Sequence, residues 1–107
     1  MSTGSPQRPG MDLRDFQQLI EKMYSHKDRR RGSAGTFIWF MEEVGELAAA
    51  IGEGTLEDKK GEFADVLAWL ATLANVEGVD LTEAVQAKYG TGCPGCGKLV
   101  CSCDEKP

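Results

Sequence analysis

The stretch FIWFMEEVGELAAAI, residues 37–51, repeats apolar side chains at the three- and four-residue intervals of an α-helix. The stretch EFADVLAWLATLANV, residues 62–76, has the same spacing. Each stretch therefore predicts an amphipathic helix whose apolar face packs against a neighbouring helix. Gly52 and Gly54 separate the two stretches and are typical of a helix end.

Four helices are expected from end to end of the central part of the chain. Asp12 with Asp15 predicts the start of a helix over residues 12–26, and the polar segment HKDRRRGSAG that follows predicts a loop. We expect the second helix over residues 35–51. Thr55 with Asp58, and Asp80 with Glu83, predict capping boxes for two further helices, which Gly78 and Gly90 end.

These elements predict an all-α fold, since no segment shows sustained strand alternation. Short connections favour an antiparallel four-helix bundle-like core over residues 11–90. Residues 1–10 are rich in Gly, Pro and Ser and predict a disordered arm. Residues 91–107 form a Cys-rich tail that cannot continue a helix.

Length and charge narrow the classes of function. The 107 residues have room for one domain, and 17 acidic against 12 basic residues give a net charge of −5. An acidic chain without a long basic stripe is not expected to bind a nucleic-acid polymer. No apolar run reaches the ~18 residues of a membrane span, and residues 1–10 lack the apolar region of a secretory signal. We therefore expect a cytoplasmic location.

Carboxylates border the apolar faces of the two central helices. Glu42, Glu43 and Glu46 form a stripe beside one face, and Glu62 and Asp65 border the other. If the faces pack together, the acidic edges become neighbours, and several carboxylates at close range repel one another without a counter-ion. Hard oxygen ligands in this number suit Mg²⁺ or Mn²⁺. The alternative is that these side chains are two solvated helix surfaces.

Both tryptophans of the chain project from the same acidic sides. Trp39 lies within the stripe of the first helix, and Trp69 lies between Asp65 and Glu62 when the second helix is viewed along its axis. Aromatic rings beside a metal site suit the stacking of a nucleobase. The alternative is packing at the rim of the bundle or in a subunit interface.

The combination of motifs resembles the MazG-type nucleoside triphosphate pyrophosphohydrolases, an all-α family. The resemblance rests on EEVGELAAAI at residues 42–51, EFADVL at 62–67 and LANVEGVDL at 73–81, in the family's order E-E-x-x-E, spacer, E-x-x-D. It implies hydrolysis between the α and β phosphates, which releases a nucleoside monophosphate and pyrophosphate. The family pattern continues with a polar Asn/Arg-containing segment in many members, whereas Gly90 and the cysteines follow here.

The resemblance also implies roles for single residues. The family's Mg²⁺ ligands correspond to Glu43, Glu46, Glu62 and Asp65. Catalysis is assigned to Glu42 and Glu43, of which Glu42 takes a supporting or water-activating place. Trp69 corresponds to an aromatic that contacts the base, and we assign Trp39 to the substrate as well. Lys88 corresponds to a lysine near the end of the last helix that contacts phosphate.

The basic segment before the second helix is a candidate phosphate clamp. Lys27 and Arg31 are the favoured members, because guanidinium and ammonium groups pair with phosphate oxygens. A solvated loop is the alternative for this segment. His26, the only histidine, and Lys59 and Lys60 are interpreted as surface residues.

All four cysteines lie in the tail, as C-P-G-C-x4-C-x-C. The first pair, with glycines inside and after it, resembles a zinc knuckle. We predict one structural Zn²⁺ bound by Cys93, Cys96, Cys101 and Cys103. Disulfides or free thiols are the alternatives.

The favoured function is a Mg²⁺-dependent hydrolase that removes non-canonical or surplus nucleoside triphosphates. A phosphoribosyl-nucleotide or a modified deoxynucleotide is a variant of this hypothesis on substrate. The rival hypothesis is a non-catalytic, zinc-stapled helical interaction module. We expect a homodimer or a dimer of dimers, because Ile38, Trp39 and Met41 lie outside the main apolar stripe and need cover.

Overall fold

The computed structural model describes residues 10–105, and the regular secondary structure of this part of the chain is all helical. It contains α1 (Leu13–Glu53), α2 (Leu56–Glu77) and α3 (Leu81–Tyr89), without a strand. The all-α prediction is therefore confirmed. The arm predicted for residues 1–10 lies outside the described residues except for Gly10. None of the helices described is both long and apolar enough to cross a membrane.

Helix α1 is bent at Gly32, and the bend replaces the loop expected there. Gly32 has φ 77° and ψ 178°, while the residues on both sides are helical. A positive φ of this size is readily available only to glycine, so a single residue redirects the chain. The predicted boundary at residue 26 and the loop that follows are wrong. The charged side chains of Lys27, Arg29 and Arg30 remain exposed on a helix, where water solvates them at no cost to helicity.

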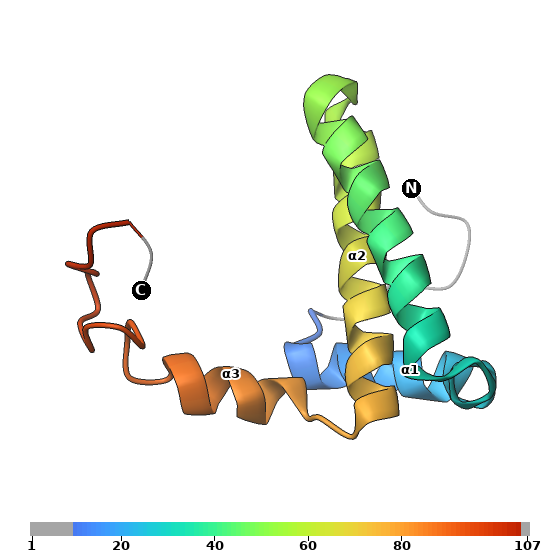
Figure 1. Ribbon diagram of the computed structural model, residues 1–107, viewed down its shortest axis with the longest axis horizontal. Coiled ribbons are helices and arrows are strands. Elements are labelled where there is room, and N and C mark those ends of the chain that lie inside the picture. Colours follow the sequence, from blue (N-terminus) through green and yellow to red (C-terminus); the bar gives the residue numbers. More distant parts are fainter. Residues whose placement is uncertain (1–9, 106–107) are drawn as a thin grey trace.

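The bend divides α1 into an N-terminal arm, residues 13–31, and a C-terminal arm, residues 33–53. The C-terminal arm runs antiparallel beside α2, and the N-terminal arm crosses the base of this hairpin (Figure 1). Helix α3 points away from the hairpin and carries the tail at its far end (Figure 1). A single chain therefore does not close the four-helix bundle that the short connections predicted.

Local capping fixes where the helices begin and end. The Thr55 hydroxyl accepts the Asp58 backbone N–H at 3.1 Å, and the Asp58 carboxylate accepts the Thr55 N–H at 2.9 Å. Gly78 ends α2 in the left-handed conformation, with φ 73°. Asp80 caps α3 by accepting the Glu83 N–H at 3.1 Å. These caps confirm the sequence prediction, although Glu83 does not return the bond within the described residues, so the second capping box is half formed.

The isolated chain buries little apolar surface. Its buried apolar residues within the described part are Ile20, Ala50, Ala71 and Ala74. Phe37 and Phe63, expected in the apolar faces of the hairpin, are 51% and 58% exposed. The radius of gyration is 16.5 Å, against about 13 Å for a compact chain of this length. The hairpin thus keeps an apolar surface that residues 10–105 do not cover.

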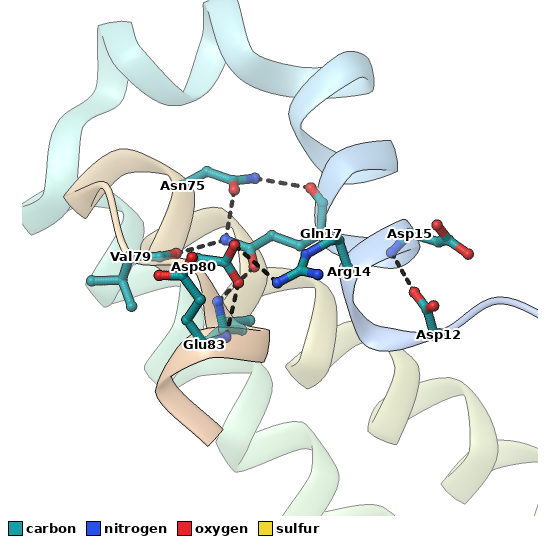
Figure 2. A network of polar contacts seen from close by, with 9 residues as sticks. Asp12, Arg14, Asp15, Gln17, Asn75, Val79, Asp80 and Glu83 are labelled. Atoms are coloured by element: carbon teal, nitrogen blue, oxygen red, sulfur yellow. Dashed lines mark hydrogen bonds and ion pairs between the residues drawn. The ribbon is translucent and has the colours of Figure 1, made fainter. Parts of the chain in front are cut away.

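A buried glutamine joins the N-terminal arm of α1 to the α2–α3 turn. The Gln17 side-chain amide donates to the Asn75 side-chain oxygen at 2.9 Å and to the Val79 carbonyl at 2.8 Å (Figure 2). Its oxygen accepts the Leu81 N–H at 2.9 Å. The side chain of Asn75 donates back to the Gln17 carbonyl at 3.3 Å, and the Arg14–Asp80 ion pair lies beside this network (Figure 2). Both ends of the amide are therefore satisfied, which makes burial of this polar group tolerable.

Replacing Gln17 by alanine should destabilise the fold by about 1–3 kcal/mol, because the Leu81 N–H and the Asn75 side-chain oxygen lose their partner in a part-buried place. Urea unfolding at one fixed protein concentration measures the change. Gln18→Ala, one residue along the same helix but exposed, is the matched control and should change stability by less than about 0.5 kcal/mol. Equal effects of the two substitutions would show that the network does not hold the arm.

Candidate functional site

An acidic cluster lies where the C-terminal arm of α1 packs against α2. Glu43 from α1 and Glu62 and Asp65 from α2 each present a carboxylate oxygen, and these atoms lie within 4.8 Å of one another. Glu42, Glu43 and Glu46 form an overlapping set within the same distance. Glu43 is common to both sets and thus lies at the centre. Packing of α1 against α2 therefore brings together carboxylates from two separate stretches of the sequence.

The electrostatics of the cluster reflect crowding of like charges. Partial burial raises the pKa of the Glu43 carboxyl above its ordinary 4.5, and the charges of Glu46, Asp65 and Glu62 raise this pKa further. The pKa of Glu62 is raised in the same way, by loss of water first and then by Glu46 and Asp65. Without a cation, the folded state therefore disfavours the charged form of both groups.

The cluster has the chemistry of a divalent-cation site. Its ligands are oxygens of carboxylates, which hard cations such as Mg²⁺ and Mn²⁺ prefer. One oxygen of Glu62, Oε1, is buried and has no hydrogen-bond partner in the described residues. An unpaired buried carboxylate oxygen beside two other carboxylates is poorly stabilised by protein alone. The donor set thus fits the metal that the sequence predicts.

A cleft adjoins the acidic cluster, between α2 and the N-terminal arm of α1. Its volume is about 360 Å³, and Asp65 lies on its wall. Lys27 and Arg31 line it from α1, and Trp69 lines it from α2. The bend at Gly32 therefore brings the basic segment, expected to be a loop, against the carboxylates as a helix.

Arg31 is held at two points beside this cleft. Its guanidinium donates to the Asp28 carboxylate at 2.7 Å and lies over the Trp69 ring, 4.8 Å from the centroid. Trp69 in turn stacks on Trp39 at 6.3 Å between ring centroids, with an interplanar angle of 21°. The two tryptophans and the arginine thus form one continuous stack next to Asp65.

Lys88 and Trp39, both assigned to substrate binding from the sequence, do not line the cleft. Lys88 is on α3, where its ammonium lies 5.8 Å from the centre of the Tyr89 ring, and it does not line the cleft. Trp39 reaches the cleft only through its stacking on Trp69. Glu42 and Glu46 are exposed, whereas Glu43 is half-buried.

Asp28 and Tyr24 line the cleft and were not among the residues assigned from the sequence. Asp28 is only 2% exposed, and its second oxygen, Oδ2, is buried without a hydrogen-bond partner in the part of the chain that the structure describes. Interpreting the segment after residue 26 as a loop concealed Asp28, whereas Tyr24 lay within the predicted helix but was not assigned to a site. Continuing the helical period from Ile20 through Tyr24 to Arg31 would have placed them on one face.

Comparison with known families gives one match. The family model described as MazG nucleotide pyrophosphohydrolase domain matches residues 32–96. This range includes all the carboxylates of the acidic cluster and both tryptophans. A search of curated proteins found no match.

Glu43→Gln should raise the melting temperature of the metal-free protein near pH 7. The pKa of Glu43 is raised in the fold, so the folded state binds this proton more tightly than the unfolded state. The group is unfavourable for folding once it ionises, above its ordinary pKa of 4.5, and this cost disappears as the pH falls below that value. The gain over wild type should therefore be present at pH 7 and vanish near pH 4.

Differential scanning fluorimetry in the presence of a chelator measures these melting temperatures at both pH values. Glu105→Gln, which is exposed in the tail and outside the helices, is the control and should give no such gain. A gain for Glu43→Gln that stays equal at pH 4 and pH 7 would contradict the charge-crowding interpretation.

Proposed function

The chain belongs to the MazG nucleotide pyrophosphohydrolase family, and on this premise we propose that it hydrolyses nucleoside triphosphates between the α and β phosphates. The products are a nucleoside monophosphate and pyrophosphate. The observation that carries the proposal is the meeting of Glu43, Glu62 and Asp65 within 4.8 Å beside a cleft lined by Lys27 and Arg31. Carboxylates that could bind a cation thus lie next to basic side chains that could bind phosphate.

Glu43, Glu46, Glu62 and Asp65 are the proposed ligands of Mg²⁺, which Mn²⁺ can replace. When bound, such a cation supplies neutralisation of phosphate oxygens and a water of lowered pKa. The chain's contribution is to hold the carboxylates together before the cation arrives. The pKa values of Glu43 and Glu62 are raised first by partial loss of water and then by neighbouring carboxylates. Both effects support this role, because a bound cation would favour the charged carboxylates.

The proposed proton acceptor is Glu42 or Glu43. Glu42 is exposed and stands outside the set formed by Glu43, Glu62 and Asp65, so its carboxylate is free to act as a general base. The oxygen of a water molecule bonds to phosphorus, the bridging P–O bond breaks, and the water proton passes to the carboxylate. Pyrophosphate leaves with the bridging electrons.

Arg31 and Lys27 are proposed to bind the triphosphate. Arg31 presents a planar fork of donors suited to phosphate oxygens, and Asp28 fixes it at 2.7 Å. The nucleobase is proposed to stack on Trp69, backed by Trp39. Because the Arg31 guanidinium lies over the Trp69 ring at 4.8 Å, a base that takes this face must displace the guanidinium. Lys88 is proposed as a further phosphate contact supplied when chains associate.

The proposed physiological substrates are non-canonical or surplus nucleoside triphosphates. A phosphoribosyl-nucleotide and a modified deoxynucleotide are compatible with the same cluster and cleft, since both carry a phosphate chain and a base. We place the reaction in a reducing cytoplasm, where the four free cysteines persist as thiols or thiolates.

The functional unit is proposed to be a homodimer or a dimer of dimers. Ile38, next to Trp39 on the C-terminal arm of α1, is 69% exposed, and Phe63 of α2 is 58% exposed. Burying such side chains is favourable by about 1.5–3 kcal/mol each. A second hairpin laid against this surface would complete a four-helix arrangement and bring α3 of one chain toward the cleft of another.

A panel of ribo- and deoxynucleoside triphosphates, incubated with the protein and Mg²⁺, should release pyrophosphate. Asp65→Asn removes a proposed ligand charge and should lower turnover by about 100-fold or more, by analogy with loss of a single charge-stabilising group. Glu57→Gln, exposed in the first turn of α2, should leave turnover unchanged. If none of the nucleotides releases pyrophosphate in a Mg²⁺-dependent way, the interaction-module hypothesis is favoured instead.

Light scattering should give twice or four times the chain mass at micromolar concentration. Ile38→Asp should shift the protein toward the monomer, because it places a charge in the proposed contact surface. Leu99→Asp changes an even more exposed apolar side chain in the tail (93% exposed) and should not alter the mass. A folded wild-type monomer at this concentration would refute the proposed assembly.

A further inference from the structure

The tail after α3 has a fixed shape but no apolar core. Within residues 91–105, the half-buried residues are Gly92, Cys93, Cys96 and Cys103, and all others are exposed. The apolar side chains Leu99 and Val100 are 93% and 83% exposed. Hydrophobic burial therefore cannot hold this segment together, and the side chains of Cys93, Cys96 and Cys103 are its least exposed.

The sulfur atoms of these cysteines converge on one point. Their four Sγ atoms all lie within 4.8 Å of one another. No disulfide joins Cys93, Cys96, Cys101 and Cys103. Cys93 Sγ is 3.6 Å from Cys101 Sγ and 3.9 Å from Cys103 Sγ. A tetrahedron with Zn–S bonds of about 2.3 Å has edges of about 3.8 Å. The two separations match such edges.

The backbone is arranged to support charged sulfurs. The Gly95 N–H points at Cys93 Sγ at 3.4 Å, the Ser102 N–H at Cys96 Sγ at 3.5 Å, and the Cys103 N–H at Cys101 Sγ at 3.2 Å. Donors directed at sulfur favour the thiolate, which is the form that binds metals.

A glycine turn closes the first half of the tail. Gly97, immediately after Cys96, has φ 75° and lets the chain reverse. After this turn the Lys98 carbonyl accepts the Cys93 N–H at 2.9 Å. The turn therefore points Cys93 and Cys96 to the same side.

We propose that Cys93, Cys96, Cys101 and Cys103 bind one Zn²⁺ in a closed, structural site. Four thiolates complete a tetrahedral shell and leave no position for substrate. Soft sulfur ligands select Zn²⁺, whereas the oxygen ligands of the acidic cluster select Mg²⁺. The proposal does not depend on the proposed function, because the family match ends at residue 96, before Cys101 and Cys103.

The zinc replaces the missing core of the tail. It ties the turn after Cys93 to the C-x-C pair and so fixes residues 93–103 at the far end of α3, away from the α1–α2 hairpin (Figure 1). Since metal binding supplies the folding free energy of such a small unit, loss of zinc should release the tail and leave the helices in place.

Elemental analysis of the full chain, expressed with zinc and purified under reducing conditions without a chelator, tests the proposal. We expect about one zinc per chain. Cys96→Ser and Cys103→Ser, one from each half, should each reduce zinc to below about half an equivalent, with circular dichroism unchanged because residues 91–105 contain no helix. Ser102→Ala, between two ligands, is the matched control and should retain the full equivalent.

Replacement of zinc by Co²⁺ provides a second readout. Wild type and Ser102→Ala should show the visible bands of tetrahedral cobalt and the near-ultraviolet sulfur-to-metal charge transfer, and both cysteine variants should lose them. Four titratable thiols with little bound zinc would overturn the proposal. It would also be overturned by iron in place of zinc, or by zinc retained in the cysteine variants.

Discussion

Repulsion among carboxylates is the force that the α1–α2 hairpin has to overcome. Glu43, Glu62 and Asp65 are held within 4.8 Å, a separation at which like charges cost about 1 kcal/mol per pair in water and more where water is excluded. Apolar contacts between the helices and the caps at Gly54 and Thr55 hold them in place. Partial loss of water first, and then these neighbouring charges, raise the pKa values of Glu43 and Glu62. In the proposed function, a divalent cation would relieve this repulsion by binding to the same carboxylates.

The bend at Gly32 connects this cluster to its basic counterpart. Because the chain turns at one glycine with φ 77°, the helix carrying Lys27, Asp28 and Arg31 crosses α2 close to Asp65. The Gln17 network then fixes the other end of that helix to the α2–α3 turn (Figure 2). The basic wall of the cleft thus comes from the N-terminal arm of α1 and the acidic wall from α2. Their relative position depends on the bend and on a small number of polar contacts rather than on a large core.

The sequence predicted most of the hairpin because its signals are local. The caps at Thr55, Gly78 and Asp80 act within a few residues, and the period of the carboxylates places them on packed faces. The bend was not predicted, since charge in the segment around Arg30 resembles a loop and nothing local distinguishes a glycine kink from a glycine turn. Asp28 was missed for the same reason. The positions of α3 and of Lys88 depend on contacts between distant parts of the chain. A helical pattern in the sequence does not determine such contacts.

Binding of Mn²⁺, followed by paramagnetic broadening in NMR spectra of the whole chain, tests the account most directly. The account predicts that broadening is centred on the amides of Glu43, Glu62 and Asp65 and on the Trp69 indole, that excess Mg²⁺ reverses it, and that Asp65→Asn abolishes it. The backbone signals of residues 93–103 should stay sharp, because the oxygen-preferring ion has no affinity for a sulfur site. Broadening spread evenly over exposed acidic residues, or unchanged in Asp65→Asn, would contradict the central claim that the packed carboxylates form a specific cation site.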